Sequence, residues 1–128
     1  MLHRGLVYIL SEVLDVNAKD VYKYAAHTNA VKCSGQTGLR GTNGGPATLT
    51  HCGEKFLRWE INHYRPKLVL AVAGDSKWLL DRFGAHVAFA YVPHPQSWRG
   101  AVLTTVPGRL REARNALRRA EGREAVRN

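Results

Sequence analysis

The chain has 128 residues, 45% of them apolar, which is the size of one domain and enough apolar material for a packed core. Lysine and arginine number 19 against 10 acidic residues, so the formal net charge is +9. This charge favours a polyanion as partner, because a basic surface attracts phosphates; the alternative is a solvated helix face, since many arginines fall between Arg109 and Arg127.

Several classes of protein are excluded at this level. Two cysteines are too few for the disulfide framework of a small secreted domain. The longest apolar run, Leu68 to Gly74, is far too short to cross a bilayer, and the first residues lack the apolar block of a signal peptide. We therefore expect a cytoplasmic protein without membrane contact, with one domain over residues 1–128 and a basic tail over residues 118–128.

The first third of the chain predicts a helix, a strand and a long loop. Leu2 to Val16 has apolar residues at helical spacing. Asp20 to Asn29 contains Val21, Tyr22, Tyr24 and Ala25 and predicts a strand that ends at Thr28-Asn29. Ser34 to Thr50 is rich in Gly, Thr, Asn and Pro and predicts a loop longer than most ordered connections, which is typical of a functional or a poorly ordered segment.

The middle of the chain predicts a helix, a buried strand and a second helix. Thr50 is a candidate N-cap of the first helix, which Arg65-Pro66 ends. Lys67 to Ala73 is a continuous run rich in Val and Leu, the pattern of a strand covered on both faces. Gly74-Asp75-Ser76 then leads into a short helix that Gly84 closes.

The last third predicts two strands and a long helix. Val87 to Val92 and Val102 to Val106 have the composition of strands. A helix is expected from about Pro107 to Arg123, with proline at its first position. Its apolar stripe is Leu110, Ala113, Leu117 and Ala120.

This order of elements predicts an α/β fold, a parallel sheet with crossover helices. Ligands of such sheets bind outside the carboxyl ends of the strands. Asn29, Gly74-Asp75 and His94 each follow a predicted strand. The sequence therefore places three polar or glycine features at one edge of the sheet.

The segment between the last two predicted strands holds a histidine between two prolines. Each proline fixes its own φ and disfavours helix at the residue before it, so Val92 and His94 are both held in extended conformations. The backbone therefore sets the direction of the histidine. A rigid turn whose histidine faces water is the structural alternative.

Taken together, these residues resemble the uracil-DNA glycosylase superfamily, and most closely its iron–sulfur branch, family 4. The similarity runs from about Leu6 to about Leu117. Each motif that carries it is short, but the motifs follow one another in the same order and at similar spacing as in the family. These motifs are Val21-Tyr22, Thr28-Asn29-Ala30-Val31-Lys32-Cys33, Cys52, Phe56-Leu57, Glu60-Ile61, Arg65-Pro66-Lys67-Leu68-Val69-Leu70-Ala71, Gly74 and His94-Pro95.

The resemblance implies a three-layer α/β/α fold with a short parallel sheet, and an enzyme that excises uracil from DNA in base excision repair. Asn29 corresponds to the asparagine that reads the edge of a flipped uracil, which suits an amide because it offers a donor and an acceptor. His94 corresponds to the histidine that donates to uracil O2, where charge grows as the glycosidic bond breaks. Gly74 and Asp75 would line the substrate pocket.

The resemblance also implies where the DNA lies. The residues from Gln96 through Ser97 and Trp98 to Arg99 would run along the DNA backbone or minor groove beside the flipped nucleotide. Trp98 would act as a wedge or stacking surface there; packing onto its own domain is the structural alternative.

Two features of the family are missing from this chain. The family's first strand ends in a Gly-Glu-x-Pro-Gly type loop that supplies or positions a water-activating carboxylate, and no such motif is present. Three explanations for the missing strand are open. The sheet is rearranged, a partner chain or segment completes it, or the chain is a truncated or degenerate member of the family. Asp75 is a candidate for the missing carboxylate, although an N-cap is the commoner role.

The iron–sulfur cluster is affected in the same way. Cys33 and Cys52 match the last two cysteines of a four-iron, four-sulfur site, which needs four thiolates. We expect no cofactor in this chain alone, and a cluster only if further ligands are supplied. Three functions therefore stay open: a uracil-DNA glycosylase, a non-catalytic nucleic-acid-binding module on the same scaffold, and an assembly protein whose basic helix faces a partner.

Overall fold

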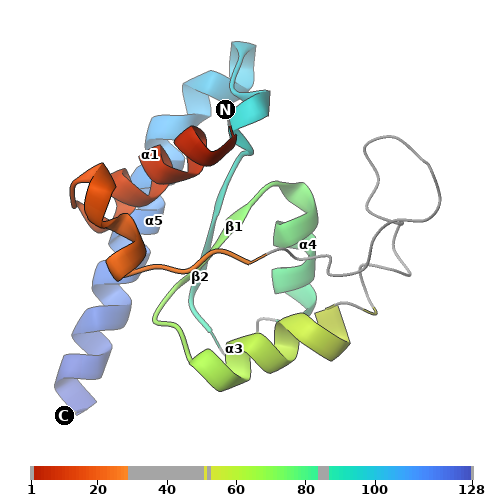
Figure 1. Cartoon of the computed structure of the whole chain (residues 1–128), viewed down its shortest axis with the longest axis vertical. Coiled ribbons are helices and arrows are strands. Elements are labelled where there is room, and N and C mark those ends of the chain that lie inside the picture. The colour runs from red at the N-terminus through yellow and green to blue at the C-terminus, as the bar shows by residue number, and fades with distance from the viewer. Residues whose placement is uncertain (1, 29–50, 52, 84–86, 128) are drawn as a thin grey trace.

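The computed structural model describes residues 2–28, 51, 53–83 and 87–127 (Figure 1). These residues form a mixed α/β structure that is mostly helical. The elements are helix α1 (Leu2–Leu14), the 3₁₀ helix η1 (Ala18–Lys23), the π-helical turn η2 (Gly53–Leu57), helix α3 (Arg58–Tyr64), strand β1 (Val69–Val72), helix α4 (Gly74–Phe83), strand β2 (Phe89–Val92), the 3₁₀ turn η3 (Pro95–Ser97) and helix α5 (Gly100–Arg127).

The sheet of the described residues consists of β1 and β2, which run parallel. Their register pairs Val69 with Phe89 and continues to the pair of Val72 with Val92. Helix α4 connects the end of β1 to the start of β2. The two strands predicted over residues 67–73 and 87–92 and the helix between them are therefore confirmed, with shorter strands than predicted.

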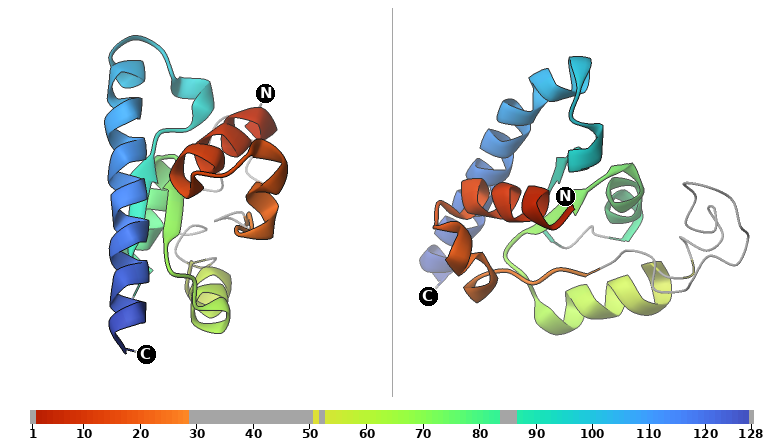
Figure 2. Two further views of the ribbon diagram at one scale, coloured as in Figure 1. Left: turned by 90° about the vertical axis from the view of Figure 1, so that its left-hand side faces the viewer. Right: turned by 45° about the horizontal axis from the view of Figure 1, so that its top comes forward.

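The core lies where α1 and α5 meet the strands (Figure 2). Ile9 and Val13 are one turn apart on α1 and pack with Val92, which is fully buried at the end of β2. The contribution of α5 is the stripe of Val106, Leu110 and Ala113. The helical spacing predicted for both segments is confirmed, since these residues lie on one face of each helix.

Helix α3 also follows the prediction. It ends at Tyr64, and Arg65 then adopts a left-handed backbone with φ 48° before Pro66. The predicted cap at Thr50 and the closing Gly84 lie outside the described residues, as does the long loop of residues 34–50.

The strand predicted from Asp20 to Asn29 is wrong. Residues Ala18–Lys23 form the 3₁₀ helix η1, and no strand follows it up to Thr28, the last described residue before the gap. Val21 is completely buried, whereas Tyr22 and Tyr24 are 46% and 67% exposed. The segment is thus anchored by one apolar side chain and pairs with neither of the two described strands.

The strand predicted from Val102 to Val106 is also wrong, because α5 begins at Gly100 and includes it. The hydroxyls of Thr104 and Thr105 donate to the carbonyls of Ala101 and Val102, three residues earlier, at 2.6 and 2.7 Å. β-branched threonine therefore finds helical partners here. Pro107 lies inside the helix and does not open it.

Candidate functional site

The loop that follows β2 is closed by its own hydrogen bonds. Its first residue, Pro93, is buried, and its carbonyl accepts a hydrogen bond of 2.8 Å from Trp98 Nε1. The carbonyl of His94 accepts from the backbone N–H of Ser97 at 2.8 Å and from the Ser97 hydroxyl at 2.7 Å. The rigid turn predicted from the two prolines is confirmed, with η3 as its central part.

The orientation and tautomer of His94 follow from one further contact. Its Nδ1 accepts a hydrogen bond of 3.1 Å from the backbone N–H of Gln96, so His94 is the N-cap of η3. An Nδ1 that accepts carries a lone pair, and the proton of the neutral ring is then on Nε2. The half-buried imidazole therefore presents Nε2–H as a donor.

Helix α1 supports this loop from the other side. At Gly5 an added Cβ would lie 2.5 Å from Cβ and Cγ of Pro95, so the Pro95 ring packs directly against the helix backbone where a residue with a side chain would collide with it. Three residues along α1, the ring of Tyr8 meets Trp98 edge to face, with centroids 5.9 Å apart and planes at 75°. Proline, tryptophan and tyrosine rings thus hold the loop against α1.

The end of β1 lies at the same edge of the sheet. The backbone N–H of Ala73 donates to the carbonyl of Val92 at 3.2 Å. The Ala73 carbonyl accepts from the N–H of Lys77, in the first turn of α4, at 3.2 Å. Ala73 has φ 95°, a left-handed conformation that is costly for a residue with a Cβ. The N-terminus of α4 therefore begins beside the His94 loop, where its free N–H groups favour negative charge.

The structure places only part of the predicted site. Gly74 is exposed in the first turn of α4, next to Asp75, whose side chain lies outside the described residues. Asn29, Cys33 and Cys52 lie outside them too, so their roles and the predicted cluster stay predictions.

The predicted DNA-contacting residues divide into two groups. Gln96, Ser97 and Arg99 are exposed on the outer side of the loop. Trp98 is half-buried, packs against the core cluster and donates its N–H to the loop itself. Trp98 therefore has the packing role of the structural alternative.

Two features were missed at the sequence level. The strained backbone of Ala73 had no signal, because alanine does not mark a left-handed position. The exposed aromatic rings of Trp59, His63 and Tyr64 on α3 had one, because residues 59 and 63 are one helical turn apart.

Three further results bear on the site. Among the described residues no three His, Cys, Asp or Glu side chains are grouped so that they could bind a metal ion. A search of the same residues found none of the helices both long enough and apolar enough to span a bilayer. Comparison of the chain with protein-family models, with curated proteins and with solved structures gave no match in any of the three.

Proposed function

We propose that the protein binds DNA and excises uracil by hydrolysis of the N-glycosidic bond, with His94 as a catalytic residue. The observation that carries this proposal is the bond from the Gln96 N–H to His94 Nδ1, which leaves Nε2–H available as a donor. A donor in a fixed place is what a leaving uracil needs at O2, because negative charge grows there as the bond breaks. The donor stabilises that charge without rearranging first.

The surroundings of His94 supply the other parts of the proposed site. The first turn of α4, with Gly74 and Asp75, begins at the same edge of the sheet and would line the uracil pocket. Asn29 would distinguish uracil from cytosine through its amide. Arg99, Gln96 and Ser97 are exposed beside the loop, where they would contact DNA phosphates.

The proposed fold is the three-layer α/β/α arrangement of the uracil-DNA glycosylases without their first strand. It is supported by α4 connecting two parallel strands and by α5 packing beside β2. Among the described residues β1 pairs with β2 alone, which leaves one edge of each strand for a partner chain or a further segment. Such a segment would also supply the missing carboxylate and the thiolates that Cys33 and Cys52 need for a cluster. The proposed compartment is the cytoplasm.

The test is the release of free uracil from a uracil-containing oligonucleotide. Removing one donor to a developing oxyanion lowers the rate by about 100- to 1,000-fold in comparable sites, and we expect this for His94→Ala. Asn29→Ala should lose the preference for uracil over cytosine. His27→Ala is the matched control, because His27 is an exposed histidine that has no part in the proposed site. Equal rates for the wild type and His94→Ala would refute the assignment.

The second candidate is a module that binds nucleic acid without cutting it. It is favoured by the formal net charge of +9, which attracts a nucleic acid whether or not the chain acts on its bases. This candidate would be supported if the affinity for DNA fell steeply with salt concentration and the wild type released no uracil.

A further inference from the structure

Helix α3 carries three aromatic rings that stack on one another in contact with solvent. The ring centroids of Trp59 and His63 are 4.6 Å apart, and the two ring planes are inclined by 8° to each other. Tyr64 stands edge-on to both, with its centroid 6.3 Å from that of Trp59 and 4.9 Å from that of His63. Trp59 is 56% exposed and Tyr64 70% exposed. We call these three residues the α3 aromatic cluster.

None of the three residues of the cluster is buried. The buried anchor of this region is Leu57, in the turn before the helix, and α3 itself has no fully buried residue. Large rings in water without a packing role mark a surface for interaction. Because the rings already hold one another, little side-chain freedom is lost when a ligand settles on them.

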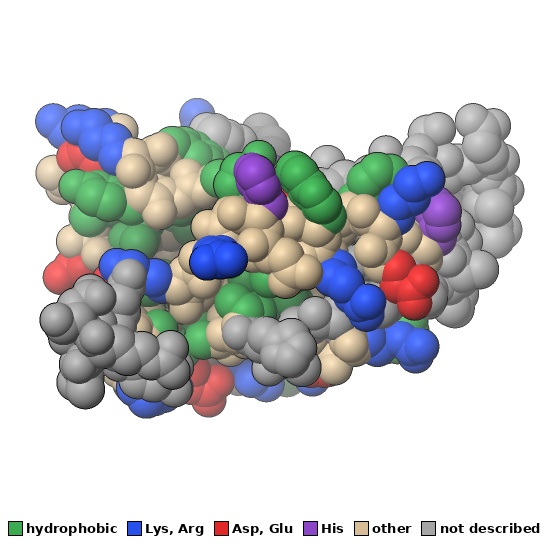
Figure 3. Space-filling view, turned by 90° about the horizontal axis from the view of Figure 1, so that it is seen from below, with side chains coloured by type: hydrophobic (Ala, Val, Ile, Leu, Met, Phe, Trp, Pro, Cys, Tyr) green, Lys and Arg blue, Asp and Glu red, His purple; other side chains and the backbone are tan. Residues whose placement is uncertain are grey.

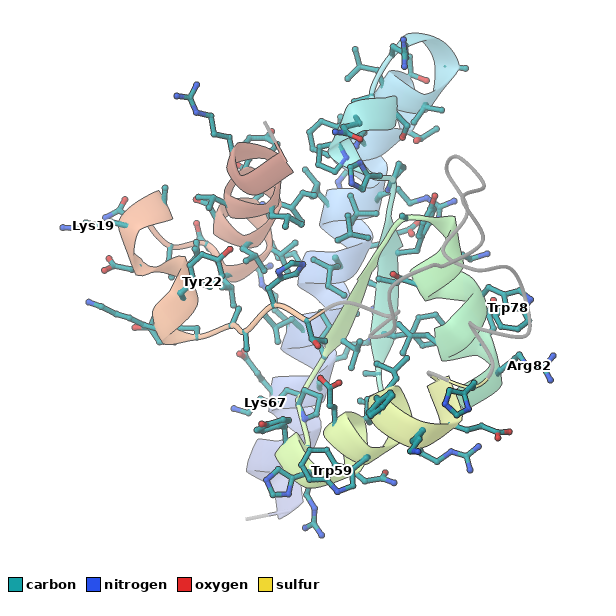
Figure 4. The ribbon with its side chains drawn as sticks, turned by 45° about the vertical axis from the view of Figure 1, so that its right-hand side comes forward. Lys19, Tyr22, Trp59, Lys67, Trp78 and Arg82 are labelled. Carbon is teal, nitrogen blue, oxygen red and sulfur yellow. The ribbon has the colours of Figure 1, made fainter. Side chains whose placement is uncertain are left out.

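Cations flank the cluster. Arg65 follows Tyr64, is exposed, and makes no ion pair among the described residues. Arg58 precedes Trp59 and Lys67 follows Pro66, both with exposed side chains. In Figure 4 the labelled Trp59 and Lys67 lie at the same end of the molecule, and Figure 3, which views that end, shows more lysine and arginine than acidic side chains.

We propose that the α3 aromatic cluster binds single-stranded nucleic acid, with bases stacked on Trp59 and Tyr64 and phosphates paired with Arg65. Aromatic rings beside cations are the combination that unpaired strands require, since bases offer a face for stacking and the backbone is anionic. A duplex hides these faces inside its own stack, so the single strand is the preferred form.

The cluster is separate from the His94 loop. Helix α3 leads into the amino end of β1, whereas His94 follows the carboxyl end of β2, so the two lie at opposite ends of the parallel sheet (Figure 1). This proposal therefore does not rest on uracil excision. It would hold for an enzyme and for a binding module alike.

The composition of the surface favours a nucleic acid over a protein partner. The exposed aliphatic residues Val102 and Leu103 are on α5, not on α3. The α3 surface instead combines rings that carry polar atoms with guanidinium and ammonium groups. A second copy of this chain, which has the same net charge of +9, would place like charges together.

The test is the affinity of the full chain for a fluorescent oligothymidylate, measured by anisotropy. Stacking on one aromatic ring contributes enough that Trp59→Ala should weaken binding by about 5- to 100-fold, whereas Trp59→Phe keeps a ring and should lose much less. The matched control for Tyr64→Ala is Tyr24→Ala. Tyr24 is 67% exposed, close to the 70% of Tyr64, but has no ring contact among the described residues. Only Tyr64→Ala should weaken binding.

Circular dichroism of each variant would show whether the fold is kept. Unchanged affinity of folded Trp59→Ala, an equal loss in Tyr24→Ala, or tighter binding of a duplex than of the single strand would each overturn the proposal. So would dimerisation of the chain that Trp59→Ala abolishes without an effect on oligonucleotide affinity. Oligothymidylate contains no uracil, so its affinity can be measured whether or not the chain excises uracil, and this proposal and the excision of uracil can fail separately.

Discussion

Arg114 provides the sharpest test of how the two long helices are joined. The last carbonyls of α1 have no partner inside the helix, and the carbonyl of Glu12 is one of them. The guanidinium of Arg114, on α5, donates to this oxygen through Nε at 2.9 Å and Nη2 at 2.7 Å. Nη2 of Arg114 is also 3.3 Å from Oε2 of the Glu12 carboxylate. One side chain therefore both caps α1 and pairs with its charge.

The two contacts differ in strength. Hydrogen bonds from a charged group contribute about 1.5–3 kcal/mol, and the side chain of Arg114 is 31% exposed, so we expect Arg114→Ala to lower the free energy of unfolding by about 2 kcal/mol. The carboxylate of Glu12 is 44% exposed, and exposed pairs contribute about 0.2–1 kcal/mol. Glu12→Gln removes only this pair, and we expect it to cost less than about 0.5 kcal/mol.

Urea denaturation followed by circular dichroism would measure both variants. Arg111→Ala is the matched control, because Arg111 is exposed on the same helix and should change stability by less than about 0.5 kcal/mol. If Glu12→Gln is as costly as Arg114→Ala, the ion pair carries the contact and the capping argument is wrong. If neither variant differs from Arg111→Ala, the contact contributes nothing.

Four further substitutions test the packing by the same assay. Gly5→Ala places a Cβ 2.5 Å from the Pro95 ring and should cost about 2 kcal/mol, whereas Gly108→Ala meets nothing within 4 Å and should stabilise α5 by about 0.5–1 kcal/mol; equal effects would contradict the close approach. Ile9→Ala empties a fully buried position and should cost about 3 kcal/mol, and a loss below about 1 kcal/mol would mean that the core is loose. Ala73→Gly relieves the φ of 95° and should gain about 1 kcal/mol; a loss would show that the methyl group packs.

The elements that could be predicted are those whose local pattern and surroundings agree. Residues 69–72 form a strand because an apolar run between Pro66 and Gly74 is too short for a helix and too apolar for a loop. His94 was predicted to be held still because proline restricts the chain locally. No distant contact was needed for either inference.

The errors came from segments in which tertiary contacts override β propensity. Val102 to Val106 has strand composition. Val106 is nevertheless buried on the same helix face as Leu110 and Ala113, and α5 therefore includes the whole run. Tyr22 and Tyr24 favour a strand only if a sheet covers them, and both are exposed. The α3 aromatic cluster was missed for a similar reason, since exposure depends on what lies opposite the helix.

The position of His94 depends on residues that are distant in the sequence. Its loop rests on the first turns of α1 through Gly5 and Tyr8, and the last turn of α1 is held to α5 by Arg114, 102 residues away from Glu12. A local pattern can predict a rigid turn, but it cannot predict which distant residues the turn contacts. Because α1 contacts the histidine loop at one end and α5 at the other, the position of the loop depends on the packing of both helices, whereas the orientation of the imidazole within the loop follows from the local bond to the Gln96 N–H.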